Sequence, residues 1–242
     1  MKDWNYDNDQ WRSLPAHLKH LPIFTRQFDL TSYLIGLIWA IFLKFAFSTY
    51  IRIKVVGSFH EMYKKHPRLL VISNHSSHLD ATSIAAAVPF RYWKDLYISA
   101  AKDYWFRNPL FTFFSKHCLG AIPIDRKDKP ADSIKLCINL LNHLDRIWLI
   151  LFPEGTRSPD GYIQTFKKGV SVFAKATDTP VLFLYIEGNK SLWPKGKLIP
   201  QPGKLKIHIG PVHPPAEVSI IEKAYKDWLL TVDEGAIAED ER

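Results

Sequence analysis

Short β-rich runs alternate with longer helical segments along most of this chain. The predicted strands cover residues 52–56, 69–73, 96–100, 121–124, 147–152, 181–186 and 205–209. The predicted helices cover residues 81–88, 131–144, 169–176 and 220–230. Alternation of this kind predicts an α/β fold in which helices pack on a mostly buried sheet.

The composition is that of a folded, basic protein. The chain has 242 residues, of which 47% are hydrophobic and 23% charged, and its formal net charge is +8. A positive balance of this size predicts an acidic partner, and nucleic acid, an anionic membrane surface and phosphorylated substrates all meet that description. The two cysteines, Cys118 and Cys137, form no CxxC pair, which argues against a disulfide framework.

A long apolar segment, LTSYLIGLIWAIFLKFAFSTY, occupies residues 30–50. Its uncharged part, residues 30–43, is shorter than the roughly twenty apolar residues of a simple spanning helix. Three interpretations remain open: a spanning helix, a helix lying in one leaflet, and a buried core helix. Basic residues on both sides and the many aromatic residues before position 115 favour membrane association without crossing.

These features divide the chain into three parts. Residues 1–50 form a predicted N-terminal, membrane-associating helical segment, and residues 51–232 form a single α/β domain. Residues 233–242, DEGAIAEDER, form an acidic tail that we expect to be frayed.

The stretch SNHSSHLD, residues 73–80, follows the apolar run of the second predicted strand. If a turn brings His75 and Asp80 together, the carboxylate can fix the tautomer of the imidazole and leave its other nitrogen free to accept a proton. A metal site made by His75, His78 and Asp80 is an alternative, although the spacing matches no common metal motif. A satisfied polar turn is the third possibility.

Two further stretches end predicted strands in the same way. In FPEGTRS, residues 152–158, the forked guanidinium of Arg157 suits a phosphate, and the amides of Gly155 and Thr156 offer additional donors. Glu154 carries the wrong charge for phosphate and is expected to orient Arg157 or a substrate hydroxyl. In GAIPIDR, residues 120–126, Arg126 also follows a strand. A β-turn with a surface ion pair is the simpler alternative for FPEGTRS.

NHSSHLD, GAIPIDR and FPEGTRS, in this order and at these separations, resemble the motifs of the glycerolipid acyltransferases typified by bacterial 1-acylglycerol-3-phosphate acyltransferase. The resemblance covers roughly residues 53–188, and it includes Lys102 at a basic position near the substrate phosphate. It implies an acyltransferase domain with a mixed central sheet flanked by helices, behind an N-terminal helical membrane motif. The family's fourth motif is matched by TPVLFLYIEG, residues 179–188. It keeps Pro180 but departs from the family, because Phe183 and Leu184 stand where a second proline is expected.

The resemblance also implies a reaction. His75 would be the general base and Asp80 its orienting carboxylate, while Lys102, Arg126, Glu154, Gly155, Thr156 and Arg157 would bind the substrate. An acyl chain would pass from acyl-CoA or acyl-carrier protein to the free hydroxyl of 1-acylglycerol-3-phosphate, giving phosphatidic acid in phospholipid synthesis. No cofactor, metal or nucleic acid is expected, and the expected location is the cytoplasmic face of the inner membrane.

Three alternatives stay open at the level of sequence. The acceptor is another lysophospholipid or a lyso-aminolipid, or the chain is a metal-dependent hydrolase, or it is a non-catalytic protein that binds membranes or nucleic acid through its basic surface. The last alternative has against it the lack of a recognisable nucleic-acid-binding module.

Overall fold

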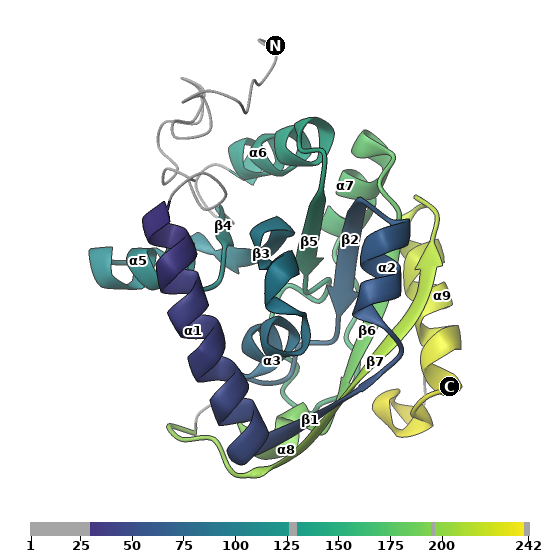
Figure 1. Cartoon of the computed structure of the whole chain (residues 1–242). Helices are drawn as coiled ribbons and strands as arrows, with labels where there is room; N and C mark the ends of the chain where they lie inside the picture. The colour runs from purple at the N-terminus through teal and green to yellow at the C-terminus, as the bar shows by residue number, and fades with distance from the viewer. Residues whose placement is uncertain (1–29, 126–129, 195–196, 240–242) are drawn as a thin grey trace.

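The computed structural model describes residues 30–125, 130–194 and 197–239. Within them, one sheet has the strand order β1-β7-β6-β2-β5-β3-β4 (Figure 1). The strands are β1 (Ile51–Val56), β2 (Arg68–Ser73), β3 (Leu96–Ala101), β4 (Ala121–Ile124), β5 (Ile147–Leu151), β6 (Val181–Glu187) and β7 (Gly203–His213). The helices are α1 (Leu30–Thr49), α2 (Phe59–Lys65), α3 (Asp80–Ala87), η3 (Phe90–Asp95), α4 (Lys102–Trp105), α5 (Pro109–His117), α6 (Pro130–His143), α7 (Gly169–Thr177), α8 (Asn189–Leu192), α9 (Val218–Leu230) and η4 (Glu234–Ala236).

The sheet is mixed. β6, β2, β5, β3 and β4 run parallel to one another, whereas β7 is antiparallel to β6 and parallel to β1. Parallel strands present their carboxyl ends at a common edge, which is where open α/β sheets bind ligands. We call this edge, formed by the ends of β6, β2, β5, β3 and β4, the carboxyl edge.

The core has two halves, one on each face of the sheet. In β2, Leu69 and Val71 face the half that includes residues of α1, α2 and α3, while Leu70 and Ile72 face the half that includes residues of α6, α7 and α9. Both sets are almost fully buried. This two-sided burial explains why the central strands are continuous apolar runs instead of alternating sequences.

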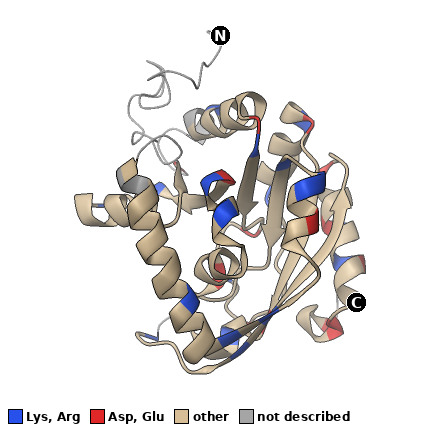
Figure 2. Cartoon of the chain, viewed as in Figure 1, with Lys and Arg blue, Asp and Glu red and all other residues tan. Residues whose placement is uncertain are grey.

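Helix α1 is apolar on all sides, which is typical of a helix with apolar surroundings on every face. Ala40, Leu43 and Phe47 are buried in the core, whereas the large apolar side chains on the opposite side of the helix are about half exposed or more. Among these, Tyr33 contacts Phe90 with a centroid distance of 5.8 Å. Lys44 is the single charged residue on α1, and Figure 2 shows no acidic residue there. No helix in the described ranges is both long and apolar enough to cross a bilayer.

The predicted α/β fold with a mixed sheet flanked by helices is confirmed, and each predicted strand is present with small shifts of its ends. Short helices such as α2 and α5 were not predicted, because seven to nine residues give little periodicity to detect.

The structure corrects the prediction for the acidic tail. Ala236 and Ile237 are buried, and the Ala236 carbonyl accepts a hydrogen bond from the amide of Ile163 at 3.0 Å. The hydroxyl of Tyr185 donates to Asp233 at 2.7 Å. The first part of the tail is therefore docked, because the apolar pair inside DEGAIA packs into the core, while residues 240–242 lie outside the described part.

Candidate active site

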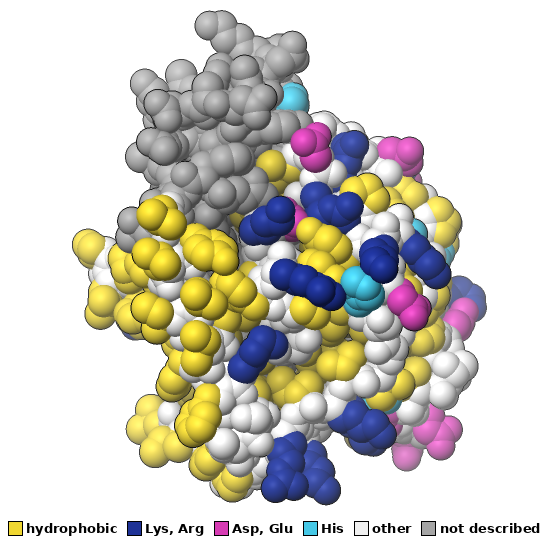
Figure 3. All heavy atoms as spheres, in the orientation of Figure 1, with side chains coloured by type: hydrophobic (Ala, Val, Ile, Leu, Met, Phe, Trp, Pro, Cys, Tyr) yellow, Lys and Arg dark blue, Asp and Glu magenta, His cyan; other side chains and the backbone are white. Residues whose placement is uncertain are grey.

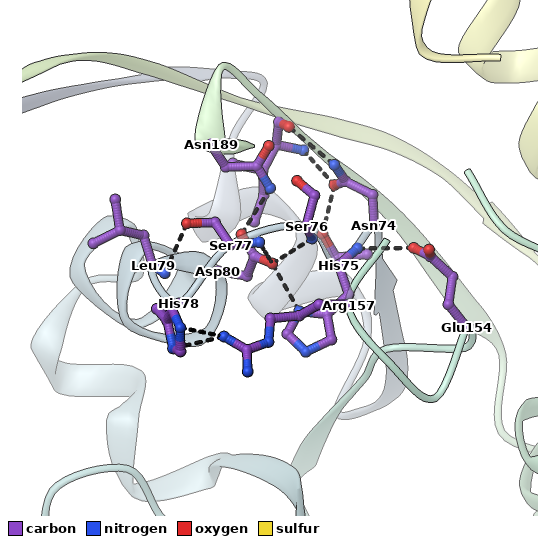
Figure 4. Close-up of polar contacts among 12 residues, drawn as sticks. Asn74, His75, Ser76, Ser77, His78, Leu79, Asp80, Glu154, Arg157 and Asn189 are labelled. Atoms are coloured by element: carbon purple, nitrogen blue, oxygen red, sulfur yellow. Dashed lines mark hydrogen bonds and ion pairs between the residues drawn. The ribbon is translucent and has the colours of Figure 1, made fainter. Parts of the chain in front are cut away.

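The first polar motif forms the turn between β2 and α3 at the carboxyl edge. There Nδ1 of His75 lies 2.7 Å from Oδ2 of Asp80, so the turn does bring the two side chains together (Figure 4). A carboxylate accepts, so Nδ1 carries the proton and Nε2 keeps its lone pair. Among the described residues Nε2 has no hydrogen-bond partner, and the ring is stacked on Phe152 with a centroid distance of 4.2 Å. A positioned imidazole with an open basic nitrogen has the geometry that a general base requires.

Asp80 is fully buried, and both oxygens of its carboxylate accept hydrogen bonds. Besides His75, Oδ2 accepts the amides of Ser76 at 2.8 Å and Ser77 at 2.9 Å. Oδ1 accepts the side-chain amide of Asn189 at 2.7 Å. A buried carboxylate needs this degree of satisfaction, and it fixes the geometry of the turn around it.

Asn189 was not predicted, although it follows the apolar run of β6 just as the other motifs follow theirs. Its position is set by Asn74, whose side chain joins the end of β2 to the end of β6. Asn74 donates to the Ile186 carbonyl at 3.0 Å and accepts from the Ile186 amide at 2.8 Å. This pair of hydrogen bonds joins the ends of β2 and β6. Asn189, at the start of α8, is thereby held within reach of Asp80 in the β2–α3 turn.

The second motif is bonded directly to the first through the backbone of His75. The His75 amide donates to Oε1 of Glu154 at 2.8 Å, and the His75 carbonyl accepts from the amide of Ser158 at 2.7 Å. Oε2 of Glu154 accepts from the amide of Gln164 at 3.3 Å. Glu154 was expected to orient Arg157 or a substrate hydroxyl. Its buried carboxyl instead accepts hydrogen bonds from the backbone and so holds the main chain of His75.

Burial raises the pKa of Glu154 to about 8, against an ordinary value of 4.5, and its two backbone hydrogen bonds oppose only part of this rise. The folded state therefore keeps a proton that the unfolded state has lost between these two values. We expect the free energy of unfolding to fall as the pH rises from about 5 to about 8. Glu154→Gln, which keeps an acceptor for His75 but does not ionise, should lack this component.

Urea unfolding of both proteins across this pH range measures the difference directly. The expected result is a gap between the two midpoints that changes with pH, with wild type losing stability relative to the variant. Parallel profiles would show that Glu154 does not hold a raised pKa.

The backbone amide of Gly155 also differs from expectation, whereas nothing contradicts the prediction for Thr156. The amide of Gly155 donates to the Phe152 carbonyl at 3.0 Å, so it closes a turn instead of facing a phosphate. The φ angle of Gly155 is +72°, and a Cβ there would lie 3.3 Å from Cγ of Lys167, which explains the glycine. Thr156 is exposed at the same turn.

Arg157 lies against His78, a residue that the sequence offered only as a ligand in the metal alternative. Its Nη1 lies 2.7 Å from Nδ1 of His78, and the centroid of the His78 ring lies 5.2 Å from that of Trp193. Burial, together with the guanidinium, lowers the pKa of His78, which favours a neutral ring that can accept from arginine. His78 therefore positions Arg157 beside the β2–α3 turn.

The third motif contributes an ion pair at the ends of β3 and β4. Nζ of Lys102 lies 3.0 Å from Oδ2 of Asp125, and the carboxylate is nearly buried. Lys102 is partly exposed, as expected of a residue that meets a ligand. Arg126, the predicted substrate-binding residue of the GAIPIDR motif, lies outside the described residues.

The metal alternative is not assembled in the described part of the chain, which contains no group of three or more His, Cys, Asp or Glu placed to hold an ion. His75 and Asp80 bond each other, and His78 turns to Arg157. The arrangement is that of a histidine–carboxylate pair beside an arginine.

Comparisons with known proteins agree with this chemistry. A family model described as Acyltransferase matches residues 52–187. A 1-acyl-sn-glycerol-3-phosphate acyltransferase of Limnanthes douglasii is 31% identical over 161 residues, which cover 65% of this chain and 53% of that protein. One of the same description from Streptococcus pneumoniae is 31% identical over 136 residues, covering 56% and 47%. The chain thus spans about half the length of these relatives.

A solved structure is similar over a larger share of the chain. The crystal structure of the 1-acyl-sn-glycerophosphate (LPA) acyltransferase PlsC from Thermotoga maritima has a TM-score of 0.65 and 27% identity. The match covers 85% of this chain and 79% of that one.

Proposed function

Because the chain belongs to the acyltransferase family, we propose that it moves a fatty acyl chain from acyl-CoA or acyl-carrier protein to the free hydroxyl of 1-acylglycerol-3-phosphate. The product is phosphatidic acid, an intermediate of phospholipid synthesis. The observation that carries the proposal is the His75–Asp80 pair, at 2.7 Å, with Nε2 of the imidazole open at the carboxyl edge.

The reaction needs no covalent acyl-enzyme. Nε2 of His75 takes the proton of the acceptor hydroxyl while that oxygen attacks the thioester carbonyl. The tetrahedral intermediate then collapses, the C–S bond breaks, and the thiolate recovers the proton from the imidazolium. Asp80 stabilises the transient positive charge, and the donors around it keep its carboxylate aimed at Nδ1.

The phosphate of the acceptor is bound by arginine and lysine side chains. Arg157 lies beside the turn that carries the base, and it contacts the neutral ring of His78. No carboxylate of the described residues binds this cation. Lys102 and Arg126 complete the basic set. Glu154 serves as a positioning residue, because it holds the backbone of His75 and not the ligand.

Arg157→Ala should raise the KM for the acceptor by roughly tenfold to a hundredfold, since a hydrogen bond to a charged group is worth about 1.5–3 kcal/mol. The KM for the acyl donor should stay within about twofold, because the proposal assigns Arg157 to the phosphate of the acceptor. The KM of Arg157→Lys for the acceptor should lie between those of wild type and Arg157→Ala, because lysine keeps the positive charge but lacks the two parallel donors of the guanidinium. Steady-state kinetics with each substrate varied in turn make the measurement, and a change confined to the donor would reassign the phosphate site.

The enzyme works at a membrane surface, on the cytoplasmic face of the inner membrane, with α1 as its contact. The exposed side of α1 carries seven large apolar residues: Leu30, Tyr33, Leu34, Ile38, Ile41, Phe42 and Phe45. A lysolipid resides in the bilayer and the thioester donor is soluble, so a helix lying in one leaflet lets the carboxyl edge meet both. The net charge of +8 favours anionic lipids and acidic donors alike.

The direct test is acyl transfer from a long-chain acyl-CoA, and separately from acyl-carrier protein, to a panel of lysolipids that differ in headgroup. Formation of phosphatidic acid from 1-acylglycerol-3-phosphate is the expected result. Faster transfer to a lysophospholipid with a larger headgroup, or to a lyso-aminolipid, would keep the chemistry and change the acceptor. Absence of transfer from both donors would contradict the proposal.

A further inference from the structure

The loop between α8 and β7 carries two strongly exposed aliphatic side chains. Leu198 is 92% exposed and Ile199 is 73% exposed, and we call this pair the apolar tip. Figure 3 shows hydrophobic side chains covering α1 and α5 and continuing at the lower left, past the lower end of α1. An apolar surface that extends over several elements marks an interaction site.

The apolar tip is continuous with the exposed side of α1. The hydroxyl of Tyr50, directly after α1, donates to the Pro200 carbonyl at 3.0 Å. The amide of Gly203 donates to the Tyr50 carbonyl at 3.2 Å. The tip is thus fastened to the end of α1, and one flat partner can cover both.

The charges around the tip indicate the chemistry of that partner. The sequence from Gly188 to Ala216 contains no acidic residue but has lysines at positions 190, 195, 197, 204 and 206. Of these, Lys206 is paired with Glu187 at 2.7 Å. Arg52 and Lys204 are partners in the register of β1 and β7, and both are exposed. Like charges side by side are unfavourable unless an anion offsets them. Apolar tips with basic flanks suit the interface of an anionic bilayer.

The same loop is bonded to the turn that carries the catalytic base. The Trp193 carbonyl accepts the Ser77 hydroxyl at 2.9 Å and the His78 amide at 3.3 Å. The indole of Trp193 donates to the Lys197 carbonyl at 2.7 Å, one residue before the tip. Hydrogen bonds therefore run from the catalytic turn to the residue next to Leu198.

We infer that Leu198 and Ile199 insert into the headgroup region of an anionic bilayer as a second anchor beside α1, and so hold the catalytic turn at the depth of the lysolipid hydroxyl. This inference rests on the proposed function, because it names the surface through which that site meets its lipid. Two anchors at separate points fix the orientation of the carboxyl edge, which one helix alone leaves free to roll.

Site-specific labelling tests the insertion. Both native cysteines are buried, so Leu198→Cys can be labelled selectively with a polarity-sensitive fluorophore. The matched control is Ile220→Cys on α9, a 53% exposed position on the other face of the sheet. With vesicles of phosphatidylcholine and phosphatidylglycerol, the label at 198 should shift to the blue and be quenched by lipids brominated near the headgroup, while the label at 220 should do neither.

The other outcomes separate the inference from its premise. Protein that sediments with vesicles while the label at 198 stays in water would overturn the tip and leave the α1 contact standing. Protein that does not sediment with vesicles would overturn both. A blue shift without lipid that grows with protein concentration would mean that a second copy covers the tip, which also overturns the inference.

Kinetics supply an independent measurement. In Leu198→Ser/Ile199→Ser, the rate with a vesicle-borne lysolipid, divided by the rate with a short-chain, water-soluble lysolipid, should fall about tenfold, since two apolar side chains no longer leave water. An unchanged ratio would overturn the inference. Failure of wild type to acylate any lysolipid would instead overturn the proposed function, whatever the label at position 198 reports.

Discussion

Replacing His75 with alanine should lower kcat by about a thousandfold, the middle of the range for loss of a general base. In the proposed reaction Nε2 of His75 accepts the proton of the acceptor hydroxyl. The buried carboxylate of Asp80 holds this imidazole in place, and alanine offers no group that could accept the proton instead. The binding of both substrates should change little, because the phosphate is bound by other residues. Acyl transfer measured at saturating acceptor and donor gives this value.

The control is His143→Ala, which removes a histidine from the end of α6, at the opposite edge of the sheet. It should keep full turnover. Circular dichroism and thermal unfolding of both variants exclude a general loss of fold. Turnover in His75→Ala equal to that of wild type, with the fold intact, would remove the general-base role.

The sequence was sufficient to identify the family and the fold class. Both are confirmed, the family by the match over residues 52–187 and the fold by the mixed sheet flanked by helices. The reason is physical: central parallel strands are long apolar runs, and polar motifs directly after them must meet at one edge. His75 and Asp80 lie in the single turn after β2. The FPEGTRS motif follows β5, the neighbour of β2, and therefore lies beside that turn.

The partners of the site could not be predicted in the same way. Asn189 reaches Asp80 across 109 positions of sequence, and Arg157 reaches His78 across 79. Such contacts depend on which strand ends are neighbours, and the order of strands in a sheet is not encoded in any local pattern. The same limit explains why the prediction for Glu154 was wrong. The sequence suggested that it orients Arg157 or a substrate hydroxyl, and its contacts with the amides of His75 and Gln164 follow only from the fold.

Phe183, which stands where the fourth family motif has a second proline, lies in the core and not at the catalytic turn. Phe183 is buried, and its ring centroid lies 5.3 Å from that of Tyr225 on α9. The pairing of β6 with β7 is irregular between Leu182 and Leu184. Phe183 therefore contributes to packing between the sheet and α9, in the core half that faces away from α1.

Two acidic substitutions on the exposed side of α1, Ile38→Asp and Phe45→Asp, should release the protein from vesicles. These side chains are 69% and 67% exposed, so the fold should tolerate the change. Burying an apolar side chain of this size is worth about 1.5–3 kcal/mol, and each 1.4 kcal/mol is a factor of ten. The partition coefficient should therefore fall at least about a hundredfold, measured by co-sedimentation with phosphatidylglycerol-containing vesicles.

Substitution is a cleaner test than deletion of residues 1–50, because Ala40, Leu43 and Phe47 belong to the core and their loss would expose it. The matched control is Ile220→Asp on α9, which places the same charge at an exposed apolar position on the other face of the sheet. The control should sediment like wild type. If the α1 variant does so as well, α1 is not the membrane contact, and the apolar side of this helix must be covered by protein instead.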